Sequence, residues 1–366
     1  MSNGHSVLHE ILLHGIEENA SDWHICEGRA IGIRSKGEIA TLGILAEKSL
    51  FDSIIETMIP ERAKVSLEET GDADFAFVEP DIGRFRANLH LQRGTRALTL
   101  RHVKSEVPSV ADLSLPPIIQ EFIEYKDGIV FVTGSTGSGK STTMACMLNH
   151  LNANFRKHVI TVEDPIEYTF EDRRCIFEQR EVGLDTLSFD SALRHALRQD
   201  PDVIVIGELR SKESVETALS AAETGHLLLT TLHTITASQS IERILDFFPH
   251  EERAGVLKAL AGSLRAIVCQ RLVPRTFEPG LIPINEIMIN TPVIRRLLLD
   301  DKVDKLEAAI AASKGDGMQS FNQALLQRIN EGSISEETGL SYSSKPESLK
   351  MNLKGIFLSE DGGIVG

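Results

Sequence analysis

A glycine-rich loop between an apolar strand and a helix sharply narrows the folds open to this chain. The segment Gly134–Ser141 reads G-x-x-x-x-G-K-S, follows the apolar run Ile129–Val132 and precedes Met144, Leu148 and Leu151 at helical spacing. In a strand–loop–helix unit of this kind, the backbone amides at the helix start form a cradle for phosphate. A glycine turn that binds nothing is the alternative, and the flanking strand and helix count against it.

The residue types in the loop indicate what each position contributes. Glycines let the backbone wrap the phosphates, Lys140 reaches the β- and γ-phosphates, and the Ser141 hydroxyl ligates Mg²⁺. The predicted cofactors are therefore ATP and Mg²⁺, with the ion held by oxygen atoms. The predicted nucleotide-binding residues are Gly134, Ser135, Thr136, Gly137, Ser138, Gly139, Lys140, Ser141 and Thr142.

Acidic residues have to complete the site, because phosphoryl transfer needs a metal holder and a group that positions the attacking water. Glu163 follows the apolar run Val159–Val162, and Glu208 follows Val203–Ile206. Ligands bind at such strand ends in an open parallel sheet. We expect both acids to act in catalysis and to hold the metal together with Ser141. Glu208 is favoured as the group that activates water, and solvated strand-end acids are the alternative.

Two histidines flank the next apolar run. His226 precedes Leu227–Leu232 and His233 follows it. We expect both to act in catalysis, although a lone histidine beside an apolar strand is more often a core or capping residue.

The apolar runs also indicate the fold class. Short β-branched runs separated by helical segments are typical of strands buried on both faces of a largely parallel sheet. We predict an α/β protein with a small N-terminal α/β domain over residues 1–108, a proline-containing linker over 109–118 and a P-loop domain over 119–366. The part from about Ala237 to 366 is predicted to be mainly helical, and it ends in a semi-apolar tail, Lys345–Gly366.

The N-terminal domain contains a strand with strict alternation. Phe85, Ala87, Leu89 and Leu91 face one way, whereas Arg84, Arg86, Asn88 and His90 face the other. This pattern predicts a half-buried strand with a cationic polar face. A second strand, Ala97–Val103, contains Arg101. The simplest interpretation of these arginines is a solvated strand face.

Bulk properties exclude several classes of protein. The formal charge is −15, from 38 Lys and Arg against 53 Asp and Glu, so no nucleic-acid partner is expected. The four cysteines are scattered, without metal-ligand spacing. No signal peptide or bilayer-length apolar run is apparent, so we expect a soluble, cytoplasmic protein, and docking on a membrane complex stays open.

Taken together, the motifs resemble the secretion and pilus ATPase family, and most closely its twitching-motility retraction group. The resemblance implies a homohexameric RecA-like ATPase whose N-terminal domain is PAS-like. It also implies that Arg86 and Arg101 reach ATP and that the histidines sense the γ-phosphate. The matching segments, in order, are Ala20–His24, Gly134–Ser141, Ile160–Glu167, Pro201–Arg210, Thr224–His233 and Gly317–Phe321.

The same resemblance implies partners and a role. The expected partners are an inner-membrane pilus platform protein and a paralogous retraction ATPase, with the ring docked peripherally at the inner membrane. The assembly ATPases of the family carry a four-cysteine zinc module and a further N-terminal domain, and this chain lacks the cysteine spacing and has no room for that domain. Retraction is therefore the predicted role. The segment Thr291–Asp300 departs from the retraction group at Arg296 and Leu299.

Three other functions stay open from the sequence. One is an accessory retraction paralogue that depends on a partner motor, to which the departures at Arg296 and Leu299 point. Another is an ATPase of a different secretion or DNA-transport machine, which DNA-stimulated turnover would support. The third is a scaffold that uses nucleotide only to hold a ring together, and normal turnover would exclude it.

Overall fold

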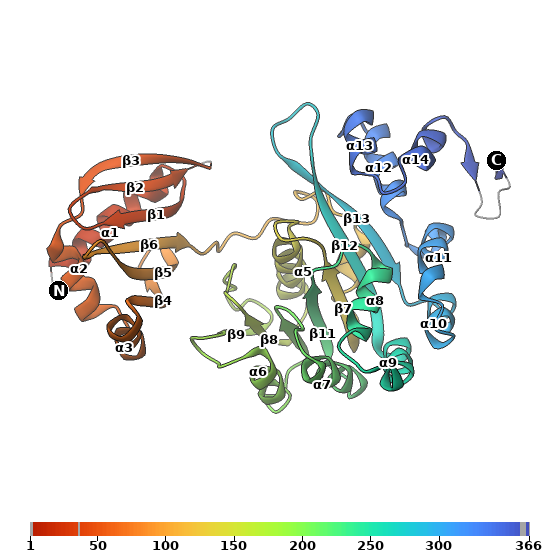
Figure 1. Cartoon of the computed structure of the whole chain (residues 1–366), viewed down its shortest axis with the longest axis horizontal. Coiled ribbons are helices and arrows are strands. Elements are labelled where there is room, and N and C mark those ends of the chain that lie inside the picture. Colours follow the sequence, from red (N-terminus) through yellow and green to blue (C-terminus); the bar gives the residue numbers. More distant parts are fainter. Residues whose placement is uncertain (1–2, 36, 359–363, 366) are drawn as a thin grey trace. The chain divides into compact units, whose positions relative to one another are not determined.

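The computed structural model describes residues 3–35, 37–358 and 364–365, and the chain divides into two compact units (Figure 1). Unit 1 comprises Met1–Glu106 with Glu167–Thr169, and unit 2 comprises Val107–Ile166 with Phe170–Gly366. Residues 359–363 and 366 of the predicted tail lie outside the described residues.

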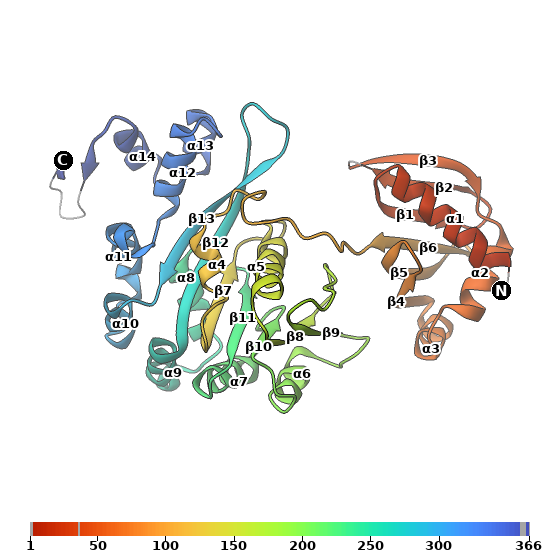
Figure 2. The same ribbon diagram turned by 180° about the vertical axis from the view of Figure 1, so that it is seen from behind.

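Unit 1 is a six-stranded antiparallel sheet in the order β3-β2-β1-β6-β5-β4. Apolar side chains of three helices share one core with the strands, and the first of these helices lies over the face of the sheet turned to the viewer in Figure 2. The strands are β1 (Ala20–Cys26), β2 (Ala30–Ser35), β3 (Glu38–Leu45), β4 (Asp72–Glu79), β5 (Gly83–Gln92) and β6 (Thr95–His102), and the helices are α1 (Asn3–Glu17), α2 (Lys48–Thr57) and α3 (Glu61–Thr70).

Trp23 is the centre of the unit 1 core. Its indole is fully buried, packs edge-to-face on Phe85 at 5.4 Å between ring centroids, and donates a hydrogen bond to the Ile11 carbonyl at 3.2 Å. Phe85, Ala87 and Leu89 of β5 share this core, while Arg84 and Arg86 alternate with them and are half-buried. Leu91, predicted on the same face, is 56% exposed. The predicted alternating strand with a cationic face is therefore confirmed.

Unit 2 is built on a seven-stranded sheet in the order β13-β12-β7-β11-β10-β8-β9. All neighbouring pairs are parallel except β12 and β13. The four strands predicted from apolar runs are confirmed at the middle of this sheet. The strands are β7 (Gly128–Thr133), β8 (His158–Glu163), β9 (Ile176–Glu181), β10 (Val203–Ile206), β11 (Leu227–Leu232), β12 (Leu264–Pro274) and β13 (Leu281–Ile289).

Helices cover both faces of the unit 2 sheet. Val130 and Val132 of β7 pack with α4 and α5, whereas Ile129 and Phe131 pack with α6 to α9, because side chains alternate along a strand. The helices are α4 (Ile118–Glu121), α5 (Lys140–Asn154), α6 (Phe189–Ala196), α7 (Lys212–Glu223), α8 (Ala237–Leu245), α9 (His250–Ser263), α10 (Pro292–Leu299), α11 (Leu306–Ala312), α12 (Phe321–Asn330), α13 (Glu336–Tyr342) and α14 (Pro346–Leu353).

Short elements complete the unit. They are the 3₁₀ turns η1 (Val303–Lys305) and η2 (Lys314–Asp316) and the strands β14 (Phe357–Leu358) and β15 (Ile364–Val365). In the described part of the chain, no helix is long and apolar enough to cross a membrane.

The prediction that the chain is mainly helical from Ala237 onward was wrong for residues 264–289. These residues form the long antiparallel hairpin of β12 and β13, and β12 pairs in parallel with β7. The run Ala266–Cys269 is completely buried. A short, fully buried apolar run has no periodicity that separates strand from helix, so the sequence alone left this choice open.

Residues 109–118, predicted as a linker, pack on unit 2. Val110 and Leu115 are buried in the same core as α5. Arg275 donates a hydrogen bond from Nη2 to the Ser114 hydroxyl at 3.3 Å, and Arg328 donates to the Ser114 carbonyl. The prolines therefore shape a docked segment, and the division between the units falls after Glu106.

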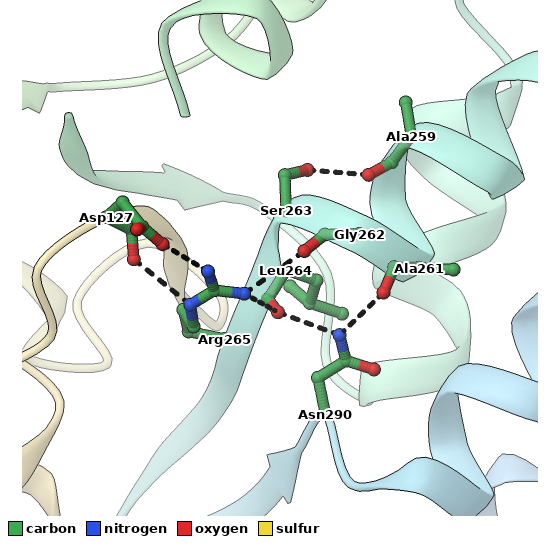
Figure 3. Close-up of polar contacts among 8 residues, drawn as sticks. All are labelled: Asp127, Ala259, Ala261, Gly262, Ser263, Leu264, Arg265 and Asn290. Atoms are coloured by element: carbon green, nitrogen blue, oxygen red, sulfur yellow. Dashed lines mark hydrogen bonds and ion pairs between the residues drawn. The ribbon is translucent and has the colours of Figure 1, made fainter. Parts of the chain in front are cut away.

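A polar junction fixes β12 beside the start of β7 (Figure 3). Asn290 donates hydrogen bonds to the carbonyls of Ala261 at 3.0 Å and Leu264 at 2.8 Å, where α9 ends. Arg265 donates to the Asp127 carbonyl at 3.1 Å and pairs with its carboxylate. The last carbonyls of α9, which have no partner inside the helix, are satisfied in this way.

Candidate nucleotide-binding site

The glycine-rich loop joins the carboxyl end of β7 to the amino end of α5. Gly134, Gly137 and Gly139 have φ angles of 149°, 78° and 85°. A Cβ atom on Gly134 would lie 2.4 Å from the Gln270 carbonyl oxygen, and one on Gly139 would lie 2.8 Å from the Gln270 side-chain nitrogen. Glycine is therefore required here both by the backbone conformation and by the close approach of β12.

Lys140 is the first residue of α5, and its side chain turns back over the loop. Its Nζ donates hydrogen bonds to the carbonyls of Gly134 at 2.8 Å and Ser135 at 3.0 Å. The cap position of α5 is Gly139, which offers the helix no side-chain oxygen. The amides of the first turn, where Ser141 and Thr142 lie, and the positive end of the helix dipole are thus suited to an anion.

Gln270 on β12 fastens the loop from behind. Its Nε2 donates to the Ser138 carbonyl at 2.7 Å, and its Oε1 accepts from the Thr143 hydroxyl at 2.8 Å and from Asn285 Nδ2 at 3.0 Å. The side chain is 3% exposed. Gln270 was not among the predicted site residues, because its segment was predicted as helical and nothing in the local pattern brings it to the loop.

Parallel pairing brings several predicted residues to one edge of the sheet. β7, β11, β10 and β8 are successive neighbours, and the loop, His233, Glu208 and Glu163 lie at their carboxyl ends. Strands in a sheet are about 4.8 Å apart, so Glu208 is about 10 Å and Glu163 about 14 Å across the sheet from β7. Glu208 and Glu163 therefore follow or end neighbouring strands at the edge that carries the loop.

Glu208 lies between two other polar side chains. Its Oε2 is 3.3 Å from His233 Nε2, and its Oε1 pairs with Arg210 Nε. The carboxylate is 16% exposed, whereas Arg210 and His233 are more than half exposed. The Arg210 guanidinium also lies 5.7 Å from the Phe189 ring centroid. Glu208 is thus oriented by its neighbours at the edge that carries the loop.

Glu163, the last residue of β8, is oriented by neutral donors. The Thr161 hydroxyl donates to its Oε1 at 2.7 Å, and Gln179 Nε2 donates to the same atom at 3.3 Å. Thr161 is on the same strand, two residues earlier, and Gln179 is on the neighbouring strand β9. Gln179 was not among the predicted site residues, because the strand β9 was not predicted.

Within its own unit, the structure does not bring His226 to the loop edge, and the role of both histidines at the γ-phosphate stays a prediction. His226 precedes β11, at the amino edge of the sheet, where its carbonyl accepts a hydrogen bond from the Gly128 amide at 3.0 Å. Its ring Nδ1 is 3.1 Å from the Ala221 carbonyl. β11 has six residues, each rising about 3.3 Å, so roughly 20 Å separates His226 from the loop edge. Within its own unit, His226 is a capping residue.

Arg86 and Arg101 form a cationic pair on unit 1, since they are direct neighbours across β5 and β6. Asp22 of β1, which is 5% exposed, accepts a hydrogen bond from Arg101 Nε at 2.7 Å. Burial raises the pKa of Asp22, but hydrogen bonds from Ser21 and Arg101 outweigh it and the pKa is lowered. In the described structure Arg86 Nε has no hydrogen-bond partner. Like charges placed opposite each other repel, and the Asp22 carboxylate offsets part of this repulsion at Arg101.

The loop, the parallel sheet and the acidic edge define a P-loop nucleotide-binding protein with a RecA-like α/β fold. The model of the type II/IV secretion system protein family matches residues 93–302, more than half of the chain. The chain belongs to this family.

Three comparisons extend the match to most of the chain. The type IV pilus retraction ATPase PilT of Pseudomonas aeruginosa is 38% identical over 340 residues, which cover 93% of this chain and 98% of PilT. The type IV pilus ATPase PilU of the same organism is also 38% identical, over 93% of this chain and 89% of PilU. A crystal structure of the pilus retraction motor PilT with bound ADP superimposes with a TM-score of 0.86 at 40% identity, covering 94% of this chain and 98% of that one.

Proposed function

We propose that this chain is an ATP-hydrolysing, ring-forming motor that drives the retraction of type IV pili and twitching motility. The observation that carries the proposal is the phosphate loop, which is hydrogen-bonded to Gln270 and lies at the same sheet edge as the Glu208–His233 pair. It occurs in a chain that matches the retraction ATPase PilT over almost its whole length. The superimposed PilT structure holds ADP, and ADP is the product that this reaction would leave.

The chemistry assigned to the loop follows from its donors. The amides of the loop and the Lys140 ammonium would hold the β- and γ-phosphates. Mg²⁺, when bound, supplies charge neutralisation at the phosphates. It prefers oxygen ligands and usually keeps several waters, and the Ser141 hydroxyl with the carboxylates of Glu163 and Glu208 fits that preference.

We assign Glu208 to the attacking water and Glu163 to the support of the metal. Each carboxylate is held in place by its own hydrogen-bonding neighbours. Measurements of turnover and of Mg²⁺ dependence therefore distinguish the two roles. Glu208→Gln should abolish turnover while ATP binding is retained. Glu163→Gln should raise the Mg²⁺ concentration at half-maximal rate. The opposite pattern would exchange the two roles.

The assembly that we propose is a homohexamer in which Arg86 and Arg101 of one subunit reach the nucleotide of its neighbour. An arginine placed there would stabilise charge on the γ-phosphate and couple hydrolysis to movement of unit 1. We further propose that the ring works in the cytoplasm, docks at the inner membrane and acts on a pilus platform protein.

Steady-state ATP hydrolysis by the purified ring tests the enzymatic part of this proposal. Lys140→Ala should remove turnover, because the phosphates lose their buried cation. Lys258→Ala, on the exposed side of α9, is the matched control and should keep the wild-type rate. Equal turnover by the two variants would refute the assigned role of the loop.

A second candidate is an accessory retraction ATPase that depends on a partner motor. The chain is as similar to PilU as to PilT, at 38% identity to each. In α10, Arg296 and Leu299, which depart from the retraction group, are 73% and 49% exposed and available to a partner. If the chain restores retraction only in cells that also contain a second retraction ATPase, the accessory role is correct.

A further inference from the structure

The orientation of Glu163 is set by a second strand. β8 and β9 pair in parallel, with Thr161 opposite Gln179. Side chains two residues apart lie on the same face of a strand, so Thr161, Glu163 and Gln179 share one face of the sheet. The two hydrogen bonds to Glu163 Oε1, at 2.7 Å from Thr161 and 3.3 Å from Gln179, follow from this placement.

The amide of Gln179 is itself oriented. Its Oε1 accepts a hydrogen bond from the Phe170 backbone amide at 2.9 Å, which turns the NH₂ group toward Glu163. The ring of Phe170 stacks on Phe177 of β9 at 4.8 Å between centroids, with 15° between the planes. The stacked rings therefore hold the Phe170 backbone beside β9, and the direction of the amide is fixed at both ends.

We propose that Gln179 is a positioning residue for ATP hydrolysis, which acts by holding the Glu163 carboxylate in its working orientation. This inference rests on the proposed ATPase function. Catalytic groups have to be placed within a fraction of an ångström, and a misplacement of about 1 Å can cost about a hundredfold in rate. Gln179 does not need to touch the nucleotide for its loss to slow the reaction.

Two substitutions at Gln179 test its NH₂ group as the donor to Glu163. Gln179→Leu removes both hydrogen bonds at similar volume. Gln179→Glu keeps an acceptor for the Phe170 amide but replaces the donor to Glu163 by a like charge. Gln327 of α12 is the matched control, because its Nε2 donates to the exposed Glu331 at 2.7 Å, so Gln327→Glu makes the same exchange far along the chain from the site.

Turnover and nucleotide affinity are measured on the purified ring. Both Gln179 variants should lower kcat by about 10- to 100-fold, with the Kd for ATP within about twofold of wild type and the melting temperature of Gln179→Glu close to that of Gln327→Glu. The double variant Glu163→Gln with Gln179→Leu should be no slower than Glu163→Gln alone, since residues that act together are not additive.

Each outcome decides the inference. Wild-type kcat in both Gln179 variants, or a double variant that loses further rate, would overturn it. A parallel loss of kcat, affinity and thermal stability would also overturn it, since that pattern marks a structural role. If the wild-type ring shows no ATP hydrolysis, the proposed function fails instead.

Discussion

Glu286 provides a test of the core beside the nucleotide site. It lies on β13, is 4% exposed and accepts a hydrogen bond from the Ala237 amide at 2.8 Å, where α8 begins. Burial raises the pKa of this carboxyl from 4.5 to about 7, and the charge of Glu307 adds to the shift. The bond from Ala237 and the charge of Arg271 oppose it without cancelling it.

The shift sets both the size and the sign of a stability change. In the unfolded chain the carboxyl ionises near 4.5, whereas in the folded protein it stays protonated up to about 7. The folded state therefore binds more protons between these values, and Glu286 lowers the free energy of unfolding as the pH rises through this window. At about 1.4 kcal/mol per pKa unit, the loss approaches roughly 3 kcal/mol above about pH 7.

Glu286→Gln should remove this pH dependence. A glutamine carbonyl can still accept from the Ala237 amide, and it has no charge to bury. Urea unfolding at matched protein concentration should show the variant gaining roughly 2 to 3 kcal/mol relative to wild type between about pH 5 and pH 8. The surface variant Glu337→Gln should show no such gain. A Glu286→Gln offset that is equal at both pH values would refute the reasoning.

Three further changes test the site. Gln270→Leu leaves the buried Ser138 carbonyl unpaired, at a cost of about 1–3 kcal/mol. Calorimetric titration should show ATP binding at least about tenfold weaker, and an unchanged Kd would show that the Gln270 hydrogen bonds do not support the loop. The kcat of His233→Ala should be at least about tenfold lower than that of His226→Ala, and equal kcat values would show that His226 acts at the site as well. Arg86→Ala should lower kcat about a hundredfold or more, and wild-type turnover would show that Arg86 is only a solvated arginine.

The arrangement of the central sheet was predictable because the relevant signals are local. The runs Ile129–Val132 and Val203–Ile206 are apolar throughout, which is what burial on both faces of a parallel sheet requires. The loop after β7 has its glycines at fixed spacing, and parallel strands place their carboxyl ends together. The shared edge of Glu208, His233 and the loop follows from these two facts.

The residues that support the site could not be predicted in this way. Gln270 reaches Ser138 across more than a hundred residues of sequence, and only the parallel pairing of β12 with β7 brings them together. The polar alternation around Gln179 is short and carries no turn signal. His226 differs from these residues, because the sequence already places it before β11, at the amino end, whereas ligands bind at the carboxyl ends of parallel strands.

Pilus number and surface motility, measured together, show whether the chain drives retraction. Cells of the native organism that lack the chain are counted for pili by electron microscopy and scored for crawling, with complementation by wild type, Lys140→Ala and Lys258→Ala. We expect abundant pili on cells that no longer crawl, with rescue by wild type and Lys258→Ala but not by Lys140→Ala. Bald cells, or unchanged piliation and motility, would contradict it.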